Sequence, residues 1–337
     1  MRSEPAVVGS PRSGTSILTW CLGHHPNIFP VPESNWMGDF AVNVGVAYQM
    51  GAARGDYSIL SAMDIGADEL FAAFGRTIGD LILDHRDHLE KKREATCVER
   101  NLDRRWLKGS SRANGPKERW VDGTPEYSFH IWGLRKLFPY ARFVHLFRDV
   151  RPVVRSMINF HRVAGFHLVA NEEEGYRYWV RTVRACLLAD RAYGPNIVRR
   201  IRYADLIEKP EPTMRSLLDF LGEPYTAKCL EPLSQRINSS DVPDDFVEDP
   251  TTDTAVVEEA MRLSRDLAGT AQPAEASPAA VNEMEVGFAQ RIQYMANLDS
   301  QYQRALQIVR KLEQTTTPQA PSLRSALNNP TASISKA

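Results

Sequence analysis

The sequence lacks the features that define several large classes of protein. Its 337 residues include only four cysteines, and these form no paired motif. Neither a disulfide framework nor a cysteine metal site is therefore predicted. No run approaches the ~20 apolar residues that a membrane span needs, and no signal-like apolar stretch follows Met1. The expected location is the reducing cytoplasm.

Excess charge of either sign is also missing. Lysine and arginine number 41 against 42 aspartates and glutamates, a formal net charge of −1. Nucleic acid is therefore not an expected partner. The charge is nevertheless uneven, because residues 142–202 are rich in arginine whereas residues 241–259 hold acids and no lysine or arginine. The first region suits a ligand with several phosphates, and the second is expected to form a solvated loop or a lid.

The first loop has the spacing of a nucleotide-binding loop but lacks its lysine. A short apolar strand, Ala6-Val7-Val8, leads into Gly9-Ser-Pro-Arg-Ser-Gly-Thr-Ser16 and a helix start. The free N–H groups of such a helix start, with the helix dipole, bind anions. Thr15 stands where a Walker loop has lysine, and the nearby cation is Arg12. This disfavours an ordinary ATPase or kinase, although a plain turn remains an alternative.

A second pattern follows the apolar stretch Arg142-Phe-Val-His-Leu-Phe147, which is typical of a buried strand. Arg148 closes this strand, and Ser156 lies eight residues later, on a helix whose first turn suits Pro152. The arginine and the hydroxyl can therefore converge on one phosphate. An exposed arginine beside a solvated helix face is the simpler alternative.

These segments, followed by Tyr203-Ala-Asp-Leu206 and Phe220-Leu-Gly222, resemble the sulfotransferases that use 3′-phosphoadenosine 5′-phosphosulfate (PAPS). The loop Pro-Arg-Ser-Gly-Thr is similar to that of the protein-tyrosine and bacterial branch. The resemblance implies a P-loop-like α/β fold, with a central parallel sheet flanked by helices, a helical insertion and a C-terminal helix. The donor-binding residues that it implies are Pro11, Arg12, Ser13, Gly14, Thr15, Ser16, Arg148, Ser156 and Tyr203.

The same resemblance implies the catalytic residues. Glu33, twenty-one residues after Arg12, lies at about the position where this branch places a glutamate base. Arg12 is expected near the bridging oxygen of the donor, where charge builds as the sulfuryl group leaves. His24 and His25 compete with Glu33 for the role of base, although histidine also suits the end of a helix. No metal is expected.

One departure from the family pattern concerns a lysine. The family often carries Lys-Thr-Pro before the second motif, whereas this chain has Gly123-Thr-Pro125. Either another residue supplies the missing positive charge, or the acceptor is bound in a different geometry. The candidate neighbours are Lys108, Lys117 and Arg119. A further ligand for the 3′-phosphate is hard to place, and Arg236 is the candidate.

Four segments are predicted along the chain. Residues 1–267 form the sulfotransferase domain, and residues 67–94 within it form an inserted amphipathic helix. Residues 268–280 are expected to be a linker and residues 281–314 a helix. Residues 315–337 are expected to be a disordered tail. The apolar side chains of the C-terminal helix recur at intervals near three and four, so packing or a homodimer is expected there.

The expected function is transfer of a sulfuryl group from PAPS to a hydroxyl group of a sugar or small-molecule acceptor. Two other classes share part of the pattern. A P-loop nucleotide or small-molecule kinase needs a lysine after Gly14 and magnesium ligands. A non-catalytic module that binds PAPS or a nucleotide can dispense with Glu33 and Arg12. Both residues are present, which favours the enzyme.

Overall fold

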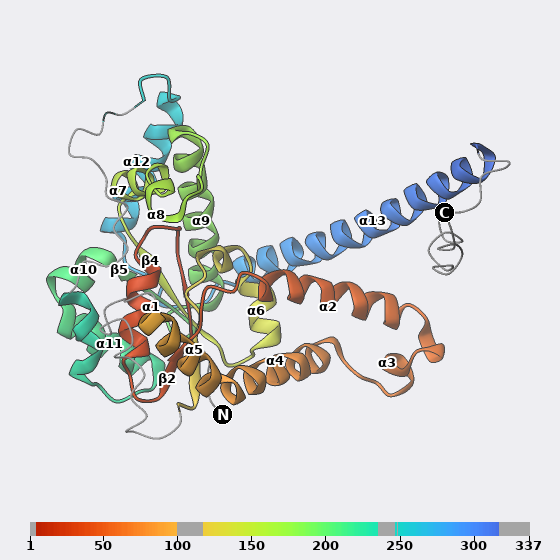
Figure 1. The fold of residues 1–337 in the computed structure, drawn as a ribbon, viewed down its shortest axis with the longest axis horizontal. Helices are drawn as coiled ribbons and strands as arrows, with labels where there is room; N and C mark the ends of the chain where they lie inside the picture. Colours follow the sequence, from red (N-terminus) through yellow and green to blue (C-terminus); the bar gives the residue numbers. More distant parts are fainter. Residues whose placement is uncertain (1–4, 100–116, 235–246, 248, 317–337) are drawn as a thin grey trace, which may run out of the picture.

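Three parallel strands form the centre of the protein, as the computed structural model of residues 5–99, 117–234, 247 and 249–316 shows (Figure 1). Their order is β1 (Pro5–Val8), β4 (Arg142–Phe147) and β5 (Val198–Arg202). Val7 pairs with Val144, and Val144 pairs with Arg199. A second parallel pair consists of β2 (Ile28–Pro30) and β3 (Arg119–Val121). The predicted α/β fold with a parallel sheet is confirmed.

The order of the strands brings the candidate motifs to one edge of the sheet. All three strands run in the same direction, so their carboxyl ends meet at a common edge, where ligands of open α/β sheets bind. A helix follows each strand within a few residues: α1 (Thr15–Gly23), α7 (Val150–Ile158) and α10 (Tyr203–Glu208). The loop after β1, the β4–α7 junction and the start of α10 therefore lie side by side.

The remaining helices surround the sheet and extend from it (Figure 1). Between β2 and β4 they are α2 (Met37–Ala52), η1 (Gly55–Tyr57), α3 (Ile59–Ala62), α4 (Ala67–Asp84), α5 (Arg86–Glu99), η4 (Pro125–Phe129) and α6 (Ile131–Leu137). After α7 they are α8 (His161–Ala164), α9 (Glu172–Tyr193), α11 (Pro210–Leu221), η5 (Ala227–Ser234), α12 (Thr254–Gly269) and α13 (Pro278–Thr316).

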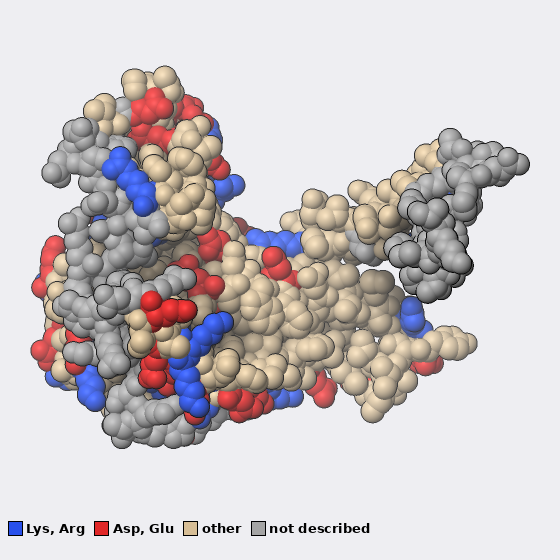
Figure 2. Space-filling view, viewed as in Figure 1, with Lys and Arg blue, Asp and Glu red and all other residues tan. Residues whose placement is uncertain are grey.

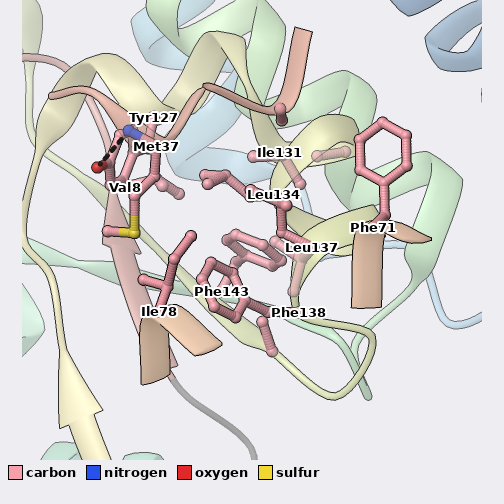
Figure 3. Close-up of a cluster of buried hydrophobic side chains, with 14 of the residues drawn as sticks. Val8, Met37, Phe71, Ile78, Tyr127, Ile131, Leu134, Leu137, Phe138 and Phe143 are labelled. Atoms are coloured by element: carbon pink, nitrogen blue, oxygen red, sulfur yellow. Dashed lines mark hydrogen bonds between the residues drawn. The ribbon is translucent and has the colours of Figure 1, made fainter. Parts of the chain in front are cut away.

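A hydrophobic cluster joins the sheet to the inserted helices (Figure 3). Val8 of β1 and Phe143 of β4 are fully buried, and they share the cluster with Ile78 of α4 and with Leu134 and Leu137 of α6. Each such side chain contributes roughly 1.5–3 kcal/mol on burial. The insertion is therefore packed on the sheet as part of the same core.

A buried ionic cluster ties β4, β5 and α9 together beneath the edge that carries the motifs. Arg200 donates from Nε and Nη2 to Asp190 at 2.9 and 2.8 Å, and His145 Nδ1 lies 3.5 Å from the same carboxylate. Burial opposes a charge on His145, but Cys186 and Asp190 outweigh this effect and raise its pKa to about 10. The carboxylate holds two neighbouring strands in register just before Arg148.

The inserted segment forms two helices, α4 and α5, which corrects the expectation of one helix over residues 67–94. The reason is the change in sequence after Asp84. Helix α4 packs an apolar face that includes Phe71 and Ile78, whereas α5 consists largely of charged residues and buries only Cys97. His85 separates the two helices, and its Nδ1 lies within hydrogen-bond distance, 3.0 Å, of the carbonyl oxygen of Leu81.

The C-terminal boundaries differ slightly from those expected. Helix α12 extends through 268–269, and α13 starts at Pro278, so the connection is shorter than the predicted linker. Part of the expected loop or lid over 241–259 is helical, because α12 begins at Thr254. Arg236, Lys108 and the predicted tail beyond Thr316 lie outside the described residues.

Candidate active site

The loop between β1 and α1 has the geometry of an anion cradle. Helix α1 begins without a capping side chain, because its N-cap is Gly14, at φ 106°. Gly14 also lies against Tyr203, since an added Cβ there would stand 2.7 Å from that ring. Ser10 Oγ is buried and has no hydrogen-bond partner in the part of the chain that the structure describes. The first-turn N–H groups and this hydroxyl suit a phosphate or phosphosulfate group.

Arg12 has a left-handed backbone conformation at φ 68°, which is uncommon for a residue with a side chain. Such a conformation costs of order 1–2 kcal/mol and persists only where the surroundings enforce it. The carbonyl of Arg12 accepts a hydrogen bond from Arg148 Nη1 at 3.2 Å. The hydrogen bond from Arg148 therefore helps to hold the strained turn.

Arg12 and Ser156, which are 144 residues apart in sequence, meet directly. Arg12 Nε donates to Ser156 Oγ at 3.1 Å, and the guanidinium lies 4.6 Å from the ring of Phe160. The guanidinium of Arg148 lies 4.5 Å from the ring of Tyr203. The structure thus brings the loop, the arginine–serine motif and Tyr203 to one place, as an anionic ligand with two phosphate groups requires.

The other loop residues shape the cradle. Ser13 Oγ donates to the carbonyl of Ser10 at 2.6 Å and closes the turn. Pro11 is buried, and Thr15 is only 3% exposed. Thr15 is therefore buried at the position where a Walker loop has the lysine that reaches the phosphates. This geometry fits the expectation that the loop does not serve an ordinary ATP site.

Glu33 lies beside the cradle. Ser16 Oγ, in the first turn of α1, donates to Glu33 Oε1 at 3.0 Å. Burial raises the pKa of Glu33 above its ordinary value, and the carboxylates of Glu126 and Asp122 raise it further, against the lowering effects of Ser16 and Arg12. A carboxylate with a raised pKa beside a charged arginine is suited to accept a proton near neutral pH.

A hydrogen-bond network fixes the chain that carries Glu33, and the sequence reasoning missed it. Ser34 Oγ contacts Asp122 Oδ2 and Tyr127 Oη, each at 2.6 Å, and Ser34 N donates to Thr124 Oγ1 at 2.9 Å. Asp122 is fully buried, and it also accepts hydrogen bonds from the backbone and hydroxyl of Thr124. The stretch Asp122-Gly-Thr-Pro125 is the local sequence signal for this network, because its aspartate and threonine supply three of the hydrogen-bonding groups.

His24 and His25 lie at the opposite end of α1 from the cradle. At 1.5 Å per residue, the nine residues of this helix place the two ends about 13 Å apart. His25 accepts from the backbone N–H of Asn27 at Nδ1 and faces the carbonyl of Pro224 with Nε2, and burial lowers its pKa. His24 faces Glu231. Both histidines are thus engaged away from Glu33.

Gly123 occupies a position that admits no side chain. An added Cβ would stand 2.1 Å from Thr19 Oγ1, a buried hydroxyl on α1 with no hydrogen-bond partner among the described residues. Two of the proposed replacement cations are held elsewhere. Lys117 Nζ donates to the carbonyls of Gly23 and Ile28 at 2.6 and 2.9 Å, and Arg119 pairs with Glu223 at 2.6 Å. Neither replaces the family's lysine at this point of the site.

Replacing Gly123 by lysine should therefore destabilise the protein and not restore a family cation. The overpacking against Thr19 is expected to lower the free energy of unfolding by about 1–3 kcal/mol. Urea titration followed by circular dichroism measures this difference. The double variant Gly123→Lys, Thr19→Ala should recover most of the loss. Equal stability of the single variant and the wild-type protein would contradict the close contact.

Comparison with known proteins agrees with this geometry. A sequence model described as "Sulfotransferase family" matches residues 6–227. The matched range holds the cradle, Glu33, Arg148, Ser156 and Tyr203 and covers more than half of the chain. The chain belongs to the sulfotransferase family.

Curated relatives and solved structures show more distant similarity. The chain is 23% identical over 237 residues to a "Putative protein-tyrosine sulfotransferase" of Caenorhabditis briggsae, covering 66% of this chain and 67% of the relative. It is 35% identical over 102 residues to "Protein-tyrosine sulfotransferase 1" of Danio rerio, covering 29% and 27%. The solved sulfotransferase STF9 from Mycobacterium avium has 17% identity and a TM-score of 0.42, with 82% of this chain and 79% of that chain covered.

Within ranges 5–99, 117–234, 247 and 249–316, no group of three or more His, Cys, Asp or Glu side chains could hold a metal ion. In the same ranges, no helix has the length and apolar character needed to cross a membrane.

Proposed function

We propose that the protein transfers a sulfuryl group from PAPS to a hydroxyl group of a sugar or small-molecule acceptor, with Glu33 as the general base. The observation that carries the proposal is the meeting of Arg12, Ser156 and Glu33 around one anion cradle. A kinase is disfavoured because Thr15 is buried where the loop would need lysine. A purely binding module has no need of a carboxylate with a raised pKa near Arg12.

The donor has two anionic ends, and the site offers a place for each. The first turn of α1 and Ser10 face the 5′ phosphosulfate, whereas Arg148 and Ser156 hold the 3′ phosphate. Arg12 belongs to the loop after β1 and donates a hydrogen bond to Ser156, so it links the two groups of residues. From there its guanidinium stabilises the negative charge that develops on the bridging oxygen as the S–O bond breaks.

The acceptor hydroxyl approaches from the side of Glu33. Glu33 takes the hydroxyl proton as the acceptor oxygen attacks sulfur, and the 5′ phosphate of the donor departs as the leaving group. Ser16 orients the base, and the Asp122–Ser34–Tyr127 network limits its movement. Glu126, which accepts a hydrogen bond from Tyr178 Oη at 3.0 Å, adds negative charge on this side.

The experiment that tests the proposal is incubation with PAPS and a panel of sugar, phenol and alcohol acceptors, read by mass spectrometry. The expected result is an acceptor product heavier by one sulfuryl group, formed together with adenosine 3′,5′-bisphosphate. Phosphorylated product from ATP and magnesium, with none from PAPS, would contradict it.

Arg148→Ala should weaken the binding of adenosine 3′,5′-bisphosphate. Losing one partner of a desolvated charge pair costs about 2–5 kcal/mol, or roughly 30-fold to several thousand-fold in Kd. Calorimetry measures the change directly. The matched control is Arg215→Ala, since that arginine is exposed and pairs with Glu211 on α11. Equal loss in both variants would remove the specific role of Arg148.

The cytoplasmic location stays a prediction. Its support is that Cys21, Cys97, Cys186 and Cys229 are each buried as free thiols, as is usual in a reducing compartment. Localisation of the tagged chain in its native cell tests this point.

A further inference from the structure

Three aromatic side chains form a row that begins close to Glu33 in the chain. Trp36, three residues after Glu33, is the N-cap residue of α2. Its ring lies 5.6 Å from that of Phe40 on α2, and the ring of Phe40 lies 5.6 Å from that of Phe74 on α4. The interplanar angles are 66° and 84°, so both contacts have the edge-to-face geometry that aromatic pairs prefer. The three rings therefore support one another in a fixed row.

The row is open to solvent in spite of these contacts. Trp36 is 45% exposed, Phe74 is 42% exposed and Phe40 is half-buried. The visible face of the helices α2, α3 and α4 is mainly uncharged (Figure 2). Single exposed apolar side chains are normal on a protein surface, whereas adjoining ones mark a binding surface.

The backbone between the base and the row is held in place. Ser34 is anchored by its hydrogen bond to Asp122 and by the network around it. Asn35 has a left-handed backbone conformation at φ 49°, which asparagine adopts more readily than most residues with a side chain. Three residues span at most about 11 Å, so the backbone of Trp36 lies within that distance of Glu33. The row is thus continuous with the candidate active site.

We propose that Trp36, Phe40 and Phe74 bind the apolar ring system of an uncharged acceptor whose hydroxyl group lies at Glu33. The inference rests on the proposed function, because it takes Glu33 as the base. The three side chains offer a single hydrogen-bond donor, the indole N–H of Trp36. A sugar, whose several hydroxyl groups need partners, is poorly matched to this surface, whereas an apolar ring system is well matched.

The charges around the base favour an uncharged acceptor. Burial, Glu126 and Asp122 raise the pKa of Glu33, whereas Ser16 and Arg12 lower it. The carboxylates of Glu126 and Asp122 therefore act on the place where the acceptor hydroxyl would lie. A carboxylate on the acceptor would add another negative charge beside them. An uncharged ring system avoids this repulsion and covers the exposed faces of the aromatic row.

Calorimetry in the presence of adenosine 3′,5′-bisphosphate tests the proposal without reference to turnover. The probe is β-naphthol, and methyl glucoside represents the sugar alternative. The wild-type chain should bind β-naphthol about 10-fold or more tightly than the glucoside. Trp36→Ala should weaken the binding of β-naphthol by about 10- to 100-fold, because one face of the ligand is left uncovered. Trp36→Phe should recover most of this loss.

The matched control is Tyr57→Ala. Tyr57 is 97% exposed and lies beyond the last residue of α2, a helix of 16 residues and thus about 24 Å long. Its removal should leave the affinity for β-naphthol unchanged. In steady-state kinetics, Trp36→Ala should raise the KM of β-naphthol by the factor seen in calorimetry and change kcat by less than about threefold. A merely structural role of Trp36 would lower the thermal stability and impair both acceptors equally.

Three results would overturn the proposal: equal affinity of the wild-type chain and Trp36→Ala for β-naphthol, the same loss in Tyr57→Ala, or tighter binding of the glucoside. A failure of the proposed function has a different signature. Binding of β-naphthol that depends on Trp36, with no transfer from PAPS to any acceptor, would contradict the sulfotransferase reaction and leave the binding surface in place.

Discussion

Glu33→Gln is expected to lower turnover by roughly 10²–10⁴-fold while binding of adenosine 3′,5′-bisphosphate stays intact. Glutamine keeps the shape of the side chain and can still accept the hydrogen bond from Ser16, which is 3.0 Å long in the native protein. It cannot accept a proton from the acceptor. Steady-state kinetics with an acceptor identified from the panel measure the loss.

The control for this substitution is Glu69→Gln, because Glu69 is an exposed carboxylate in the first turn of α4. Its turnover should equal that of the wild-type protein. Near-normal turnover of Glu33→Gln would mean that another group accepts the proton of the acceptor hydroxyl. His24 and His25 are poor replacements, since both lie at the far end of α1 and are engaged there.

The pH dependence follows from the raised pKa of Glu33. Burial, Glu126 and Asp122 favour the protonated carboxyl, so they raise the pKa of Glu33 above the ordinary glutamate pKa of about 4.3. Glu33 can act as a base only when it is deprotonated, at a pH near or above this raised pKa. Activity should therefore rise with pH through this shifted pKa. Glu126→Gln removes one of the raising charges and should move the acidic limb of kcat to lower pH.

Arg12→Ala is expected to lower kcat by about 10²–10³-fold, the usual effect of losing one preorganised donor to the developing charge. Alanine, like arginine, has a Cβ, so the backbone at φ 68° is no more relaxed in the variant and the loss reports on the guanidinium. A change confined to the KM of the donor would make Arg12 a binding residue.

Ser156→Ala distinguishes the role of Ser156 in binding the donor from the role of Arg12 in the catalytic step. It removes the hydroxyl that lies 3.1 Å from Arg12 Nε but leaves the guanidinium in place. Bisphosphate affinity should fall in this variant, whereas the catalytic step should be less affected than in Arg12→Ala. Equal losses of kcat in both variants would mean that the serine acts mainly by holding the arginine.

The donor motifs were predictable because their signals are local. A strand, a glycine loop and a helix start are contiguous in sequence, and Arg148 and Ser156 lie on one strand–helix unit. Parallel strands then bring these units to one edge, as the fold class implies. The family and the α/β fold are confirmed, whereas the roles of the individual site residues stay predictions.

The features that the sequence did not predict depend on contacts between distant segments. Asp122 and Ser34 are 88 residues apart, and their hydrogen bond has no local signal. The exclusion of a side chain at Gly123 depends on the position of Thr19 on another element. The apolar spacing of α13 was visible in the sequence, but the packing of Ile292 against Gly45 of α2 was not.

The most direct test of the central claim is calorimetric titration with adenosine 3′,5′-bisphosphate and with 5′-AMP, both in the presence of EDTA. We predict tight, magnesium-independent binding of the bisphosphate and weaker binding of 5′-AMP by about 30-fold or more, since only the bisphosphate engages Arg148 and Ser156. Equal affinities, or binding that requires magnesium, would contradict a PAPS site at this edge of the sheet.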